Sequence, residues 1–128
     1  KSGVDVRLLI PDISDSWTAQ HATNSYLEQL FEANIKIYRY TKGFIHAKTM
    51  VVDDIFTTIG TSNMDYRSFN INFEINALIY NEEKAKEAKQ IFLDDLKDAK
   101  NITFEQWTNR PKIERLKEAY CRLWAPLL

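Results

Sequence analysis

A histidine and a lysine stand two residues apart in the sequence, at the start of an apolar run that ends in aspartates. His46, Lys48 and Asp53 form the pattern His-x-Lys-x-x-x-x-Asp. A strand is predicted over residues 45–53, and its alternation places His46 and Lys48 on one face. Leaving even a neutral polar group unpaired on a buried face costs about 2–7 kcal/mol, and an unpaired cation costs more. These two side chains therefore need a partner, and the natural partner is an anion.

A short polar segment follows the next predicted strand. The sequence GTSN, residues 60–63, comes at the end of a strand predicted over residues 55–60. An antiparallel return would bring the end of that strand back beside the start of the histidine strand. The Thr61 hydroxyl and the Asn63 amide can both donate hydrogen bonds to an oxyanion. An isolated His-x-Lys pair is most often a structural histidine beside a solvated lysine, but the added donors favour a phosphate site.

Strands and helices alternate along the chain and must position these groups. Period-two alternation predicts the strands, and apolar residues at helical spacing predict the helices. Residues 12–25 are polar and are predicted to be irregular, so His21 is expected in a loop. The predicted strands are 4–10, 35–40, 45–53, 55–60 and 72–80, and the predicted helices are 23–33, 82–99 and 112–124. This order predicts an α/β fold, with a mixed sheet flanked by helices.

The last predicted helix carries a row of apolar residues. These are Ile113, Leu116, Tyr120, Leu123 and Trp124. We expect Trp107 and Trp124 to pack the C-terminal helices onto the rest of the domain. An amphipathic membrane role is the alternative, which the short length and the mixed charge of the helix make less favoured.

Length and composition limit the classes of function. The chain has 128 residues, 45% of them hydrophobic, which is enough for one domain over residues 1–128. A formal net charge of −1 provides no basic field for nucleic acid. Cys121 is the only cysteine, so a reducing compartment is the simpler assumption. No apolar run approaches the roughly 20 residues that span a bilayer, and the chain by itself is expected to be soluble.

Two segments of the sequence resemble a known family. HAKTMVVD resembles the HKD motif of the phospholipase D superfamily, and GTSN resembles the Gly-Ser-x-Asn element that follows it there. The wider sequence around both segments resembles one branch of this superfamily, the bacterial cardiolipin synthases. The similarity runs from GVDVRLLIP near the start to RLWAPLL at the end, which is nearly the whole chain.

The resemblance implies a metal-free and cofactor-free chemistry. One histidine attacks a phosphodiester and forms a phosphohistidine, and a second histidine serves as general acid and base. Carried onto this chain, His46 takes one of these two roles, and Lys48, Thr61 and Asn63 bind the phosphate. Thr61 stands where the family usually has serine. Glu74 is implied to hydrogen-bond a catalytic histidine and orient its ring.

The third residue of the motif, Asp53, is expected to have a different role. At about 3.3 Å per residue, a straight strand would place it more than ~20 Å from His46. We therefore expect Asp53 to anchor a turn or a helix end, although it belongs to the catalytic motif.

The chain departs from the family in having one HKD motif where the site needs two. The resemblance therefore implies the C-terminal half of a longer cardiolipin synthase, with the other HKD half of the same chain as partner. It further implies phosphatidylglycerol as substrate, a location of the whole enzyme at the cytoplasmic face of the cell membrane, and an inactive isolated half. The alternatives are a single-motif phosphodiesterase or nuclease that completes its site by homodimerisation, and a non-catalytic binding domain.

Overall fold

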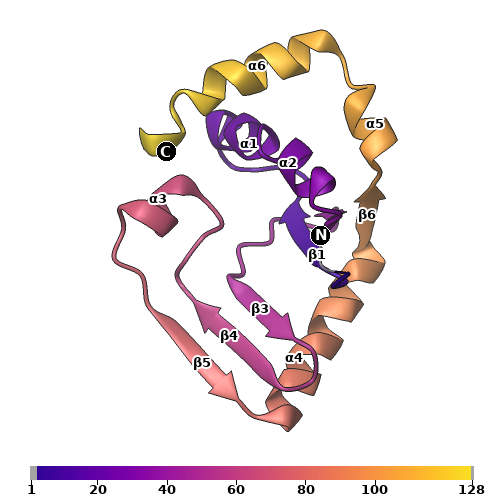
Figure 1. Cartoon of the computed structure of the whole chain (residues 1–128), viewed down its shortest axis with the longest axis vertical. Coiled ribbons are helices and arrows are strands. Elements are labelled where there is room, and N and C mark those ends of the chain that lie inside the picture. The colour runs from indigo at the N-terminus through magenta and orange to yellow at the C-terminus, as the bar shows by residue number, and fades with distance from the viewer. Residues whose placement is uncertain (1–2, 128) are drawn as a thin grey trace.

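A computed structural model describes residues 3–127 and shows an α/β fold, which confirms the predicted fold class (Figure 1). No helix within these residues is long and apolar enough to cross a membrane. The strands are β1 (Arg7–Pro11), β2 (Lys36–Tyr40), β3 (Thr49–Val52), β4 (Phe56–Gly60), β5 (Asn76–Tyr80) and β6 (Ala99–Ile102). The helices are α1 (Trp17–Asn24), α2 (Leu27–Glu32), α3 (Tyr66–Asn70), α4 (Glu82–Asp95), α5 (Phe104–Thr108) and α6 (Lys112–Arg122), with 3-10 turns η1 (Leu96–Asp98) and η2 (Ala125–Leu127).

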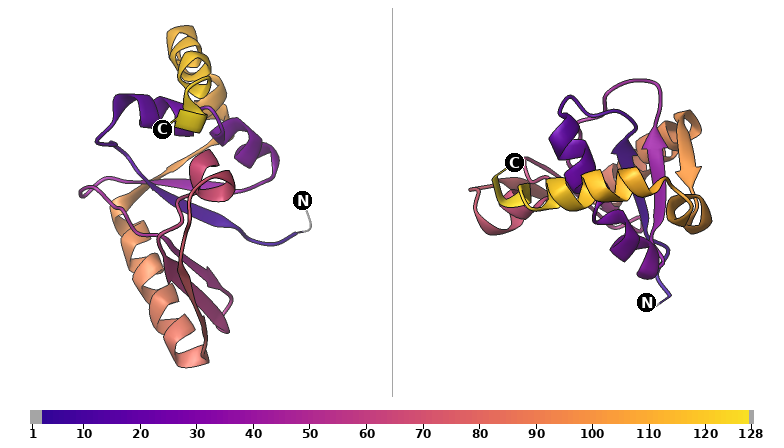
Figure 2. Two further views of the ribbon diagram at one scale, coloured as in Figure 1. Left: turned by 90° about the vertical axis from the view of Figure 1, so that its left-hand side faces the viewer. Right: turned by 90° about the horizontal axis from the view of Figure 1, so that it is seen from above.

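The strands form two three-stranded sheets. The first has the order β1-β2-β6, with β1 parallel to β2, Leu8 opposite Ile37, and β6 antiparallel to β2. The second has the order β3-β4-β5, with all neighbours antiparallel and Met50 opposite Thr58. Helix α4 runs along the second sheet, and the other long helices gather at the far end of the molecule (Figures 1 and 2).

The main core lies between the first sheet and helices α2 and α5. Leu27 of α2, Ile37 of β2 and Trp107 of α5 are buried together. A smaller cluster, which includes Ala22 and Cys121, joins α1 to α6. Apolar burial therefore concentrates around the first sheet, away from the segment that carries His46.

The segment predicted to be irregular contains helix α1, so that prediction was wrong. The Ser16 hydroxyl caps the helix by accepting from the backbone N–H of Ala19 at 3.3 Å. At the other end, the Ser25 hydroxyl donates to the Ala22 carbonyl at 2.6 Å. The single helix predicted over residues 23–33 is divided here into α1 and α2. Side-chain caps set these boundaries, and a polar composition does not reveal them.

His21 was also misplaced by the sequence analysis, because it is buried in α1 and does not lie in a loop. Its Nδ1 lies 2.8 Å from the carbonyl oxygen of Trp17, one turn earlier. Its Nε2 lies 3.3 Å from a carboxylate oxygen of Glu114 in α6. His21 therefore links α1 to α6, a structural role that depends on a residue distant in sequence.

Two elements near the C-terminus were missed. The helix predicted over residues 82–99 ends earlier, and Ala99–Ile102 form β6 at the edge of the first sheet. Thr103 and Gln106 then form a capping box that starts α5. Strand β6 has four residues and apolar side chains only at its two ends, so it offers no alternation to detect.

A buried ion pair holds α6 in place. The Arg110 guanidinium donates to both carboxylate oxygens of Glu118, with the shortest distance 2.8 Å. It also lies over the Trp107 ring, 4.2 Å from the ring centroid. The Glu118 side chain is only 4% exposed and that of Arg110 13%. Removal of one partner would leave the other charge buried without compensation.

We expect Glu118→Ala to lower the free energy of unfolding by about 3 kcal/mol, because the buried Arg110 loses its main counter-ion. Urea denaturation followed by circular dichroism measures this loss. Glu83→Ala, on the exposed side of α4, is the control and should change the free energy by less than about 0.5 kcal/mol. Equal effects of the two substitutions would show that the ion pair does not hold α6.

Candidate active site

The histidine and the lysine lie just before β3 rather than within it. Strand β3 begins at Thr49, so the strand predicted over residues 45–53 was too long at its start. The backbone N–H of Gly60, at the end of β4, donates to the Lys48 carbonyl at 3.0 Å. The Lys48 ammonium donates to the carbonyl of His46 at 3.2 Å. The end of β4 therefore fixes where this segment meets the second sheet.

The His46 ring is exposed and rests against an aromatic neighbour. It stacks on Phe44, with 5.6 Å between the ring centroids and an angle of 24° between the planes. This contact limits the orientations of the ring while leaving it open to solvent. An accessible imidazole with a restricted orientation suits a nucleophile or a general acid and base.

A close approach between strands requires glycine at the start of the GTSN segment. A Cβ atom on Gly60 would lie 1.8 Å from Oδ1 of Asn76 and 2.5 Å from the carbonyl oxygen of Ile75. Any side chain here would push β4 and β5 apart. Gly60 thus allows Thr61 to lie directly against the start of β5.

Thr61 is held by three hydrogen bonds at this junction. Its backbone N–H donates to the Ile75 carbonyl, and its hydroxyl oxygen accepts from the Ile75 N–H, both at 3.0 Å. The hydroxyl proton goes to the Glu74 carboxylate. The hydrogen bond from the Thr61 hydroxyl is the main cause that lowers the pKa of Glu74 below its ordinary value. Hydrogen bonds from Ser68 and Asn72 and the charge of Lys48 lower this pKa further.

The role predicted for Glu74 was to orient a catalytic histidine. Within residues 3–127, the carboxylate contacts Thr61 and Asn72 rather than the His46 ring. The orienting role therefore stays a prediction, and the observed role of Glu74 is to fix the hydroxyl of Thr61.

The loop beyond Thr61 contains a residue that the sequence analysis overlooked. Ser68 is buried, and its hydroxyl accepts from the backbone N–H of Asn63 at 3.1 Å. Asp65 caps α3 by accepting from the Ser68 N–H at 2.7 Å. The Asn63 side chain itself is exposed. The sequence did carry a signal for this loop, because an aspartate such as Asp65 is typical of a helix N-terminus and could have predicted the start of α3.

Asp53 lies at the other end of β3, in the turn that leads to β4. Its φ of 50° is left-handed, at the first central position of the turn in which the Ile55 N–H donates to the Val52 carbonyl at 3.3 Å. The neighbouring Asp54 pairs with Lys89 of α4 at 2.7 Å. The structure thus brings His46, Lys48 and Thr61 to one end of the second sheet and places Asp53 at the opposite end.

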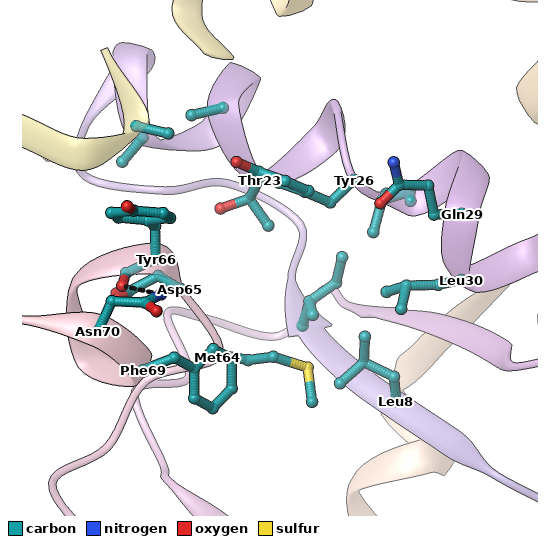
Figure 3. A pocket seen from close by; sticks show the side chains of 15 residues that line it. Leu8, Thr23, Tyr26, Gln29, Leu30, Met64, Asp65, Tyr66, Phe69 and Asn70 are labelled. Carbon is teal, nitrogen blue, oxygen red and sulfur yellow. Dashed lines mark hydrogen bonds between the residues drawn. The ribbon is translucent and has the colours of Figure 1, made fainter. Parts of the chain in front are cut away.

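An apolar cavity of about 380 Å³ lies between helices α1 and α2 on one side and α3 on the other (Figure 3). Leu8 and Leu30 line one wall, and Met64 and Phe69 line the other. Its volume is that of a ligand pocket, but none of the candidate catalytic residues lines it. The candidate catalytic residues at the end of the second sheet are therefore separate from this cavity. No three His, Cys, Asp or Glu side chains within residues 3–127 are grouped so as to hold a metal ion.

Comparison with protein families identifies the group to which this arrangement belongs. Residues 1–96 match the family model described as the phospholipase D-like domain of cardiolipin synthase. The chain belongs to this cardiolipin synthase domain family. The match includes the HKD segment, the GTSN segment and Glu74.

Individual cardiolipin synthases support the assignment over nearly the whole chain. The enzymes named cardiolipin synthase from Halalkalibacterium halodurans and Geobacillus kaustophilus are each 46% identical over 127 residues, which is 99% of this chain and 25% of each relative. The one from Clostridium perfringens is 45% identical and is covered to 27%. This cardiolipin synthase domain therefore spans about a quarter of the length of the curated relatives it matches.

A solved structure shows the same fold. The phospholipase D family member Nuc from Salmonella typhimurium aligns with a TM-score of 0.65 over 79% of this chain and 66% of that chain. Its sequence identity of 20% supports a common fold and carries no further argument.

The contact between Thr61 and Glu74 can be tested by titration. We expect Thr61→Val to raise the pKa of Glu74 towards its ordinary value, because the substitution removes the largest cause of the lowering. A carboxylate with a lowered pKa in the folded state stabilises the fold above its unfolded pKa, and this stability is lost as the pH falls through the folded value. The variant should therefore lose less stability on acidification.

Carbon-13 NMR of the Glu74 side-chain carboxyl, followed against pH, measures the shift. Thr61→Ser is the matched control, since it keeps the hydroxyl and should keep the low pKa. A serine variant that shifts as far as the valine variant would contradict a role for the hydroxyl.

Proposed function

We propose that this chain is the C-terminal catalytic half of a cardiolipin synthase, which transfers a phosphatidyl group from one phosphatidylglycerol to another and releases glycerol. The observation that carries the proposal is the meeting of the His46–Lys48 segment with the Thr61–Asn63 loop at one end of the second sheet. Similarity to cardiolipin synthases over 99% of the chain supports the choice of reaction.

The reaction proceeds in two displacements. An imidazole nitrogen attacks the phosphorus of the first phosphatidylglycerol, a nitrogen–phosphorus bond forms, and the bond to the glycerol oxygen breaks. A second histidine protonates the departing glycerol oxygen and then takes the proton from a hydroxyl of the second phosphatidylglycerol. That hydroxyl attacks the phosphohistidine, which restores the imidazole and forms cardiolipin. His46 is either the nucleophile or the general acid and base, and the histidine of the other half has the remaining role.

The residues around His46 stabilise the charge that develops on the phosphate oxygens. Lys48 supplies a positive charge, and the exposed Asn63 amide supplies a neutral donor. Thr61 has one hydroxyl proton, which Glu74 accepts in the free protein. A bound phosphate oxygen would take over that proton, and Glu74 would then be free to orient a histidine across the completed site.

The remainder of the longer enzyme completes the site. His46, Thr61 and Asn63 are exposed and Lys48 is half-buried, and displacement at phosphorus needs a nucleophile and an acid on opposite sides of the phosphate. We assign the opposite side to a second HKD half in the rest of the chain, and we place the whole enzyme at the cell membrane, where both substrates reside.

In the longer enzyme, we expect His46→Ala to reduce cardiolipin formation from phosphatidylglycerol by at least about 10²–10⁴-fold, the usual contribution of proton transfer alone. Lys48→Ala should also reduce it strongly, whereas Lys86→Ala, on the exposed side of α4, should leave it unchanged. The isolated chain should have negligible activity. Robust synthesis by the isolated chain would instead support a homodimer that completes its own site.

The isolated chain should still bind inorganic phosphate weakly through its half of the site. The dissociation constant should be in the millimolar range, about −4 kcal/mol, because the site is open to water that screens its charges. Titration of phosphate against the NMR signals of the His46 ring measures this affinity. Lys48→Ala should remove the response and Lys86→Ala should keep it. An unchanged response in Lys48→Ala would mean that Lys48 does not bind the anion.

A further inference from the structure

Helix α6 is packed with its polar side inward. Glu118 is buried against Arg110 and Cys121 against Ala22 of α1, whereas a row of apolar side chains on the same helix faces solvent. Ile113, Leu116, Tyr120 and Leu123 are between 56% and 76% exposed. Of the two tryptophans predicted to pack the C-terminal helices onto the domain, Trp107 is buried at 7% exposure, which confirms the prediction for it, whereas Trp124 is 46% exposed.

The exposed side chains form a continuous stripe along the helix. We define the α6 stripe as Ile113, Leu116, Tyr120 and Leu123, whose spacings of three and four residues place them on one face. Trp124 and Leu127 extend it beyond the helix, 46% and 71% exposed respectively. Figure 1 shows that α6 runs along the outer edge of the molecule, and Figure 2 shows it standing clear of both sheets. Nothing among residues 3–127 covers the stripe.

The acidic and basic residues of α6 differ in how exposed they are. Glu118 is buried and pairs with Arg110, whereas Glu114 is half-buried, pairs with Lys117 at 2.7 Å and lies beside His21. The exposed charged residues are all basic and consist of Lys112, Arg115 and Arg122. Arg115 donates to the Thr108 carbonyl, and Arg122 lies over the Tyr26 ring. Lys112 precedes Leu116 by about one turn and therefore flanks the stripe directly.

This arrangement favours a lipid surface over a second copy of the chain. Two stripes in contact would bring basic flanks together, and the one partly exposed acid of α6, Glu114, is already paired with Lys117. An anionic bilayer would instead accept the aliphatic side chains, place the Tyr120 and Trp124 rings at the level of the headgroups, and attract the basic residues. We propose that α6 is an interfacial helix that docks this domain on an anionic phospholipid surface, with the α6 stripe inserted.

The inference goes beyond the proposed function, on which it rests only for the choice of phosphatidylglycerol as the anionic lipid. The test is co-sedimentation of the chain with sucrose-loaded vesicles, of phosphatidylglycerol mixed with phosphatidylcholine or of phosphatidylcholine alone. We expect binding to the anionic vesicles that weakens in high salt, and at least about tenfold weaker binding to the neutral ones.

Two matched pairs of variants locate the docking surface. Leu116→Asp should weaken binding by at least about tenfold, because an acid enters the inserted stripe, while Leu78→Asp on the exposed edge strand β5 should not. Leu116 and Leu78 are similarly exposed, at 66% and 59%. Lys112→Glu should weaken vesicle binding by about 25-fold, because it changes the charge by two units and each unit near the surface contributes about fivefold in affinity. Lys86→Glu should leave vesicle binding unchanged.

Several results would overturn the proposal. The first is that the unmodified chain does not bind anionic vesicles. The second is that the stripe and control variants lose vesicle binding equally. The third is that the chain forms a concentration-dependent dimer that Leu116→Asp converts to monomer. His46→Ala should bind vesicles as well as the unmodified chain. Loss of cardiolipin formation by the longer enzyme with intact vesicle binding of this chain, or the reverse, would separate a failure of the proposed reaction from a failure of the docking surface.

Discussion

The close contact between the end of β4 and the start of β5 is the constraint on which the candidate site depends. Gly60 has no room for a side chain, and its N–H reaches the Lys48 carbonyl while the next residue bonds to both backbone groups of Ile75. Three segments far apart in sequence thereby meet at one point. A bulkier residue at position 60 would separate Lys48, Thr61 and Glu74 together, because the same junction places all three.

The site differs from an enclosed pocket in how it would bind its substrate. His46 and Asn63 are exposed, and the cavity seen in Figure 3 lies elsewhere. An exposed cation and a few donors give weak and screened attraction for phosphate. Strong stabilisation of a transition state needs a site from which water is excluded. The arrangement is therefore consistent with a half-site that gains its catalytic power only when another surface closes over it.

The regular elements that the sequence predicted well are those with a long and clear apolar period. Strands β2 and β4 and helices α4 and α6 lie close to their predicted positions. Helix α1 and strand β6 were not predicted, because hydroxyl caps set the boundaries of α1 and pairing with β2 sets those of β6, and neither leaves a periodic pattern. The location of His21 was also predicted wrongly, because its partner Glu114 lies 93 residues away in the sequence.

The sequence by itself determined which groups the proposed chemistry depends on, because residue types and short spacings can be read without a structure: an imidazole, an ammonium group and small donors in an order that resembles the HKD motif. It also predicted that Asp53 belongs to a turn, from the length of a strand alone. Only the tertiary structure decided which groups meet. It joined Thr61 to Glu74 through strand pairing, and it turned the apolar row of α6 outward, because Glu118 and Cys121 on the opposite face are buried against Arg110 and Ala22, which lie elsewhere in the sequence.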